Sequence, residues 1–211
     1  MNEIELIKQM ISDTEESIKF FSGQKKPDRE QSVCAALLRC LGIKFKIDDL
    51  KPNRNDPPDI CFSAANFEIK EYLDDGIRRH EEYKKFLEKL KTAKKLSDLI
   101  EPYTPPQPLT ISAACDRVTN FIENYAKAYG DKLCSSLDLI VYFNLNGYYL
   151  DDKDISANLS GMKKQGWRSV SIVSNSNAFI FFALENAPVF LKNAIGNIKC
   201  EWEGFGLFDL N

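Results

Sequence analysis

The chain has 211 residues, a net charge of −3, and enough aromatic side chains (14 Phe, 8 Tyr, 2 Trp) to build a packed core, which excludes wholesale disorder. No apolar run approaches the roughly 20 residues that a membrane span requires. Residues 1–20 carry acids where a secretory signal needs a basic patch and an apolar block. We therefore expect one cytoplasmic domain over residues 1–211, with no membrane contact.

Six cysteines and a single histidine, His80, limit the metal and catalytic chemistry. The absence of any C-x-x-C pair argues against a structural zinc site, and without a secretory signal we expect reduced, buried thiols. Catalysis of the Ser-His-Asp or Cys-His type would have to depend on His80. That residue lies in the charged run IRRHEEYKK, where a solvated helix face is the commoner reading.

Periodicity and breaker residues predict the elements of the first half of the chain. In order, these are a helix over 3–21, a helix from an Asp28 N-cap to Gly42, a strand at 43–47, a loop at 51–58, and strands at 59–62 and 66–73 around a turn at Ser63–Asn66.

The second half predicts further helices and strands in turn. These are a helix over 77–100, a linker at 101–108, a helix over 112–133, a buried strand at 137–145, a hairpin through Asn146-Gly147 into 148–150, strands at 168–174 and 178–184, and a helix over 187–196. Helices that bracket a mostly sequential sheet indicate an α/β or α+β fold.

The hairpin within residues 56–73 holds the pattern of greatest chemical interest. We expect a turn symmetric about Ala64 and Ala65, which puts the apolar residues of both strands on the core face: Ile60, Phe62, Phe67 and Ile69. The charged residues Asp59, Glu68 and Lys70 then share the opposite face. In this register Lys70 lies across from Asp59 and one strand step beyond Glu68.

Two neighbouring carboxylates repel each other unless a positive charge lies between them, and a hard divalent cation with oxygen ligands meets that need. Mg²⁺ held in this way can assist attack on a phosphate, and a nearby lysine can orient the attacking water. The alternative is a solvent-facing salt bridge between Asp59 and Lys70, worth about 0.2–1 kcal/mol.

Pro58-Asp59 followed by Glu68-Ile69-Lys70 resembles the PD-(D/E)-x-K signature of the restriction-endonuclease-like superfamily, and the order of predicted elements resembles its αβββαβ core. Other blocks resemble a bacterial family of unknown function that is described as endonucleases. These are RE-x2-VC-x2-LL at 29–38, PPDI-x-F at 57–62, ANFE at 65–68, LDDG-x-RR-x-EE at 73–82, LDL at 137–139 and QGWRS at 165–169.

The resemblance implies a nuclease core at about 28–145, with a mixed central sheet flanked by helices. An amino-terminal helix and a strand-strand-helix extension at about 146–211 would complete the fold. It also implies that Asp59, Glu68 and the backbone carbonyl of Ile69 bind Mg²⁺ or Mn²⁺, with Lys70 as the catalytic lysine. The implied activity is hydrolysis of phosphodiester bonds in nucleic acid, with DNA favoured over RNA.

Glu30 is a fourth candidate for this site. It shares a helical face with Cys34, Leu37 and Leu41, so it points toward the interior. A buried acid needs a partner, which a metal site or Lys70 would supply. The alternative is that Glu30 complements the helix dipole in the first turn.

Two basic segments are candidates for contacts with nucleic acid. Residues 78–95 contain eight Lys or Arg against three acids, including Arg78 and Arg79, and the second segment comprises Lys163, Lys164, Gln165 and Arg168. Trp167, which lies between Gln165 and Arg168, is more readily explained as a core residue. Asp138 could support a metal site or cap a turn.

A catalytically inactive nuclease-fold protein that binds nucleic acid or regulates a partner is the rival interpretation. The isoelectric point of about 5.4 favours it, because nucleic-acid enzymes are usually more basic. Retention of Asp59, Glu68 and Lys70 favours an enzyme. A homodimer is compatible with either reading.

Overall fold

The computed structural model of the protein describes residues 2–53, 56–74, 76–145, 147–151, 156–174 and 177–200. The chain divides into two compact units, the first built from Met1–Arg29 with Leu73–Pro105 and the second from Glu30–Tyr72 with Pro106–Asn211. One boundary, between Pro105 and Pro106, falls inside the predicted linker. The expectation of one domain over the whole chain stays a prediction.

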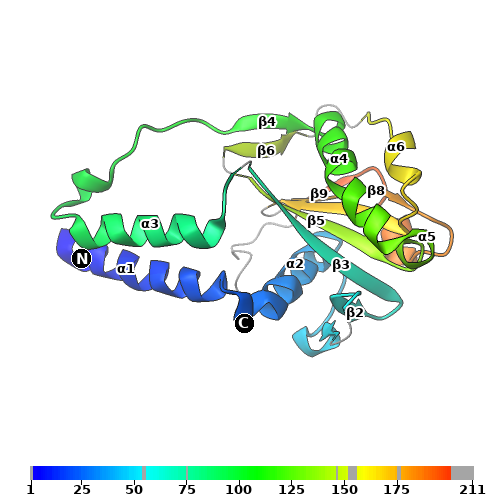
Figure 1. Ribbon diagram of the computed structural model, residues 1–211, viewed down its shortest axis with the longest axis horizontal. Coiled ribbons are helices and arrows are strands. Elements are labelled where there is room, and N and C mark those ends of the chain that lie inside the picture. The colour runs from blue at the N-terminus through cyan, green and yellow to red at the C-terminus, as the bar shows by residue number, and fades with distance from the viewer. Residues whose placement is uncertain are drawn as a thin grey trace. The chain divides into compact units, whose positions relative to one another are not determined.

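The first unit is built around two antiparallel helices, α1 (Glu3–Phe20) and α3 (Arg79–Thr92), which lie side by side in Figure 1. Phe21 stacks on Tyr83 with ring centroids 5.2 Å apart, and Lys91 Nζ lies 3.2 Å from Glu15 Oε1. The start of α1 is fixed by Asn2, which forms a capping box with Glu5. The predicted amino-terminal helix is confirmed.

The predicted helix over 77–100 is shorter in the structure. It ends at Thr92, and the 3-10 turn η3 (Leu96–Leu99) follows. The Asp98 carboxylate accepts hydrogen bonds from the backbone N–H groups of Lys94 (3.0 Å) and Lys95 (3.3 Å). An acid that caps a new turn competes with continuation of the helix, a preference that periodicity alone does not reveal.

The second unit contains a mixed sheet. Among the described residues, seven strands pair in the order β1-β2-β3-β5-β7-β8-β9. Their bounds are β1 (Lys51–Pro52), β2 (Ile60–Phe62), β3 (Ala65–Leu73), β5 (Asp138–Asn144), β7 (Ser169–Ser174), β8 (Asn177–Ala183) and β9 (Ile198–Cys200). β5 and β7 are parallel, whereas β2 with β3, β7 with β8 and β8 with β9 are antiparallel.

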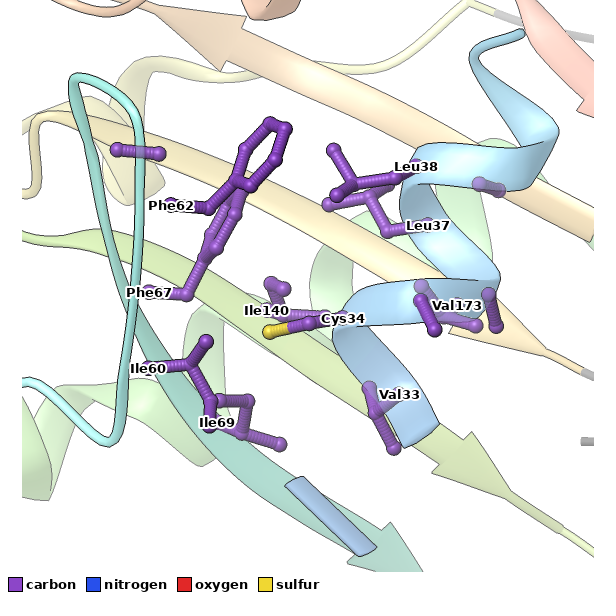
Figure 2. Close-up of a cluster of buried hydrophobic side chains, with 14 of the residues drawn as sticks. Val33, Cys34, Leu37, Leu38, Ile60, Phe62, Phe67, Ile69, Ile140 and Val173 are labelled. Carbon is purple, nitrogen blue, oxygen red and sulfur yellow. The ribbon is translucent and has the colours of Figure 1, made fainter. Parts of the chain in front are cut away.

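Helices cover both faces of this sheet, as the sequence predicts. α2 (Lys26–Cys40) packs on one face and α4 (Ile111–Tyr129) on the other. β5 shows the division, because Ile140 and Tyr142 join the cluster beneath α2, while Leu139, Val141 and Phe143 join the cluster beneath α4. Figure 2 shows the α2 cluster, in which Phe62 and Phe67 of the hairpin point toward the helix.

Shorter elements complete the described part of the second unit. They are the helices α5 (Asp131–Cys134), α6 (Ser160–Lys163) and α7 (Val189–Lys192), the 3-10 turn η2 (Ile47–Asp49), and a parallel pair of strands, β4 (Gln107–Thr110) and β6 (Tyr148–Asp151). The turn η1 (Gly23–Lys25) belongs to the first unit. None of the described helices combines the length and apolar character needed to cross a bilayer.

The predicted strand at 43–47 is wrong. Its alternation reflects packing, since Ile43, Phe45 and Ile47 all lie against the α2 cluster, but within the described residues the segment pairs with no strand. β1 pairs with β2 instead, inside the segment predicted to be a loop. Pro52 is tolerated there because an edge strand can lack an N–H donor.

Three other local predictions need correction. Asp28 lies within the first turn of α2 rather than at its N-cap, because the helix begins at Lys26. The predicted hairpin after β5 does not form, since β6 pairs in parallel with β4; Asn146 lies outside the described residues. The predicted helix over 187–196 contracts to the single turn α7.

Candidate metal centre

The β2–β3 hairpin pairs in a register two residues away from the predicted one. Its pairs are Ile60 with Phe67, Cys61 with Asn66 and Phe62 with Ala65. The loop is Ser63–Ala64, one residue earlier than predicted, and Ser63 has a φ of 51°, the positive value that a type II′ turn needs at its first position. Continued by one residue, this register sets Asp59 opposite Glu68, so the predicted opposition of Asp59 and Lys70 is wrong.

The hairpin brings three carboxylates together. Asp56, Asp59 and Glu68 each offer one oxygen, and these oxygens lie within 4.8 Å of one another. Asp59 and Glu68 are buried and Asp56 is exposed. Asp59 is fixed to the neighbouring strand because its Oδ2 accepts a hydrogen bond of 2.8 Å from the backbone N–H of Ile69. Sequence reasoning missed Asp56, whose signal was its position just ahead of the two prolines that precede Asp59.

The two oxygens of Glu68 have different surroundings. Oε1 accepts hydrogen bonds from Lys70 Nζ at 2.5 Å and from the Tyr129 hydroxyl at 2.7 Å. Oε2 is buried and has no hydrogen-bond partner among the described residues. Burial raises the pKa of Glu68, and the charge of Asp59 acts in the same direction, against the two hydrogen bonds. A buried acceptor without a donor is costly, and a bound cation would relieve that cost.

Lys70 lies beside this carboxylate with its side chain 16% exposed. Its ammonium nitrogen is 5.2 Å from the centroid of the Tyr125 ring and 5.6 Å from that of Tyr129. Burial acts to lower the pKa of Lys70, but the hydrogen bond and negative charge of Glu68 outweigh it, so the net pKa is raised. Lys70 therefore carries its charge at neutral pH.

Glu30 faces the interior, as predicted, and is 8% exposed. One helical turn further, the buried Cys34 thiol has a pKa well above its usual range, because of burial first and then the negative charges of Asp59 and Glu30. Glu30 is not a member of the three-carboxylate group found in the described chain. Its part in a metal site, like that of the Ile69 carbonyl, stays a prediction.

Arg168 is engaged in a buried ion pair rather than presented on the surface. Its guanidinium binds both carboxylate oxygens of Asp138, with 3.0 Å between Nε and Oδ1, and donates a hydrogen bond of 3.2 Å to the Ala64 carbonyl. Asp138 also accepts from the Ser169 hydroxyl (2.8 Å) and the Asn66 backbone N–H (3.1 Å). The pair thus ties the hairpin turn to the start of β5 and β7, and Asp138 acts as an anchor.

The other members of the second basic segment divide between core and surface. Trp167 is fully buried with its ring 5.8 Å from that of Tyr129, which confirms the core reading. Gln165 donates to the Thr119 carbonyl at 2.8 Å. Lys163 and Lys164 are exposed, so they remain candidates for contacts with phosphate.

The basic segment 78–95 belongs to the first unit, whose sequence carries thirteen acids and thirteen bases. Within the described residues, four of its eight cations pair with carboxylates: Arg79, Lys84, Lys89 and Lys91. Arg78 is exposed. The local excess of positive charge is therefore balanced within its own unit, and the whole net charge of −3 belongs to the second unit.

Fold and site define a mixed α/β protein with an acidic centre, flanked by a lysine, on a hairpin of its sheet. The chain belongs to a family described as "Putative endonuclease, protein of unknown function (DUF1780)", whose model matches residues 2–206.

One solved structure is similar over nearly the whole chain. It is a protein of unknown function from Pseudomonas aeruginosa strain PAO1, described as belonging to the monooxygenase superfamily. The two proteins are 25% identical, with a TM-score of 0.65, and the match covers 97% of this chain and 98% of that one. No curated protein matches the sequence.

Proposed function

We propose that the protein is a metal-dependent endonuclease that hydrolyses phosphodiester bonds in nucleic acid, with DNA as the favoured substrate. The observation that carries the proposal is the buried Glu68 Oε2, which lacks a donor in the described chain and belongs to a residue grouped with Asp56 and Asp59. The description of the family as endonucleases supports it.

The order of elements supports the same proposal. α2, β1, β2, β3, α4 and β5 follow one another as αβββαβ, with α3 and β4 inserted between β3 and α4, and the single turn α5 between α4 and β5. This is the order of the restriction-endonuclease-like core that the PD-(D/E)-x-K resemblance implies, with β1 in place of the strand predicted at 43–47.

The residues present fit Mg²⁺ or Mn²⁺, because three carboxylates supply the oxygen ligands that such ions prefer. Asp56, Asp59 and Glu68 would hold the ion, with the Ile69 carbonyl as the further ligand expected from the sequence. When bound, a hard divalent cation neutralises charge on the scissile phosphate and acidifies water.

Lys70 would act beside that ion. Its charged ammonium is held on Glu68 Oε1, so it can orient the attacking water and stabilise negative charge that develops on the phosphate. Exclusion of solvent from the Glu68 side of the site strengthens each of these interactions. Lys163 and Lys164 would contact the phosphate backbone away from the reacting bond.

A cleavage assay tests the proposal. Supercoiled plasmid and circular single-stranded DNA are incubated with the full chain and Mg²⁺ or Mn²⁺, with EDTA as the negative control. Glu68→Gln and Lys70→Ala are expected to lower the cleavage rate at least about a hundredfold, as loss of a group that stabilises the transition state does.

Glu71→Gln is the matched control. Glu71 lies on the same strand but is exposed, and it accepts a hydrogen bond from the side chain of Asn144. The Glu71→Gln variant should cleave DNA at the wild-type rate. Equal cleavage by Glu68→Gln and wild type would contradict the proposal. DNA binding without cleavage at any metal concentration would favour the inactive binding protein.

A further inference from the structure

We propose that Tyr129 is a positioning residue of the carboxylate centre, whose hydroxyl holds Glu68 by Oε1 and thereby reserves Oε2 for the cation. The inference rests on the proposed function, because it assigns Tyr129 a role only if the centre binds a metal. Tyr129 reaches Glu68 from α4, 61 residues further along the chain.

Two donors on one oxygen restrict the carboxylate more than a single donor would. The terminal torsion of a glutamate is broad and nearly twofold, so a carboxylate held by Lys70 alone could rotate and exchange its oxygens. The Tyr129 hydroxyl adds a second hydrogen bond, 2.7 Å long, from a different element. Rotation would then break two hydrogen bonds, one of them to a charged group, inside a buried site.

Tyr129 is itself firmly placed. It is the last residue of α4, and the following Gly130, with a φ of 73°, ends the helix by donating its N–H to the Ala126 carbonyl at 2.8 Å. The Tyr129 ring packs edge-to-face against the buried Trp167. A group that orients a metal ligand must be rigid itself, and these contacts provide that rigidity.

The test compares Mn²⁺ binding by the full-length wild type and Tyr129→Phe, measured by isothermal titration calorimetry. The substitution keeps the ring beside Trp167 and Lys70 and removes only the hydroxyl. We expect the Kd for Mn²⁺ to rise about 10- to 100-fold, as it does on loss of a group that orients a metal ligand. Saturating Mn²⁺ should restore most of the cleavage rate, because Glu68 and Lys70 remain.

Tyr72→Phe is the matched control. Tyr72 lies on β3 two residues beyond Lys70, and its ring packs on Phe121 and Phe143 rather than beside Glu68. The Kd of the Tyr72→Phe variant for Mn²⁺ should equal that of the wild type. Circular dichroism of the metal-free proteins shows whether each variant is folded, and Tyr129→Met provides a second variant without the hydroxyl.

Tight Mn²⁺ binding by wild type and by Tyr129→Phe alike would overturn the role of Tyr129 and leave the proposed function standing. Absence of Mn²⁺ binding by the wild type would overturn both. A fall in Mn²⁺ affinity in Tyr72→Phe as large as that in Tyr129→Phe would also overturn the inference, since the loss would then come from general disturbance of packing between β3 and α4.

Discussion

Replacement of Lys70 by Met tests whether the centre is a buried charge network or an ordinary surface ion pair. The substitution removes the ammonium 2.5 Å from Glu68 Oε1 and keeps a long, unbranched side chain between the tyrosine rings. Glu68 would keep the Tyr129 hydroxyl as a donor, but the nearby charges of Asp56 and Asp59 would no longer be offset by Lys70.

The expected loss of stability follows from the burial of the ion pair between Lys70 and Glu68. Removing one partner of a buried ion pair typically costs about 3–5 kcal/mol, because the remaining charge has no compensation. In a chain of this length that loss lowers the melting temperature by about 6–20 °C. An exposed ion pair would cost less than about 1 kcal/mol, or under about 4 °C. Lys132→Met, which replaces an exposed lysine in the same unit, should leave the melting temperature unchanged.

Added metal then separates the explanations. A ligand that binds only the folded state at 100 times its Kd stabilises it by about 2.7 kcal/mol, which corresponds to roughly 5–11 °C here. A thermal-shift titration with Mg²⁺ and Mn²⁺ should therefore recover much of the loss in Lys70→Met. A fall of less than about 4 °C would refute the buried network. No response to either metal in either protein would refute the metal centre.

Three other predictions concern residues of the second unit. Arg168→Met should lower the free energy of unfolding in urea by about 3–5 kcal/mol, because Asp138 is only 1% exposed; a loss under about 1 kcal/mol would contradict the anchoring role. Trp167→Ala should cost about 3–5 kcal/mol in the same assay, unlike removal of a surface side chain. Among the cysteines whose side chains are described, iodoacetamide followed by mass spectrometry should find Cys61 labelled first, because the others are buried; earlier labelling of Cys34 would contradict its burial.

The sequence predicts the elements whose burial pattern is long and regular. α1, α4, β5, β7 and β8 all form close to the expected bounds, because each repeats its apolar residues over several turns or strand steps. The segment 43–47 shows where this fails. Its alternating side chains do pack against the core, but a strand also requires a neighbour to bond with, and the pattern of one segment does not encode that neighbour.

Contacts between residues that are distant in the sequence were the least predictable part of the site. From the sequence, Asp138 was expected either to support a metal site or to cap a turn. The structure instead pairs it with Arg168, thirty residues later. Tyr129 gave no signal at all, because nothing local distinguishes a tyrosine that binds a carboxylate from one that fills an apolar stripe. Both contacts depend on how the helices pack on the sheet, which periodicity leaves undetermined.

The acidic face of the hairpin was nevertheless predicted correctly from a wrong register. Side chains alternate with a period of two, so an error of two residues leaves Asp59, Glu68 and Lys70 on the same face. The turn lies one residue earlier than predicted, and this does change the pairing: Asp59 moves opposite Glu68, and Lys70 binds Glu68 from within its own strand. This concentrates negative charge on the hairpin while the ammonium occupies only one Glu68 oxygen. The shifted turn thus leaves a stronger demand for a cation than the predicted register would have done.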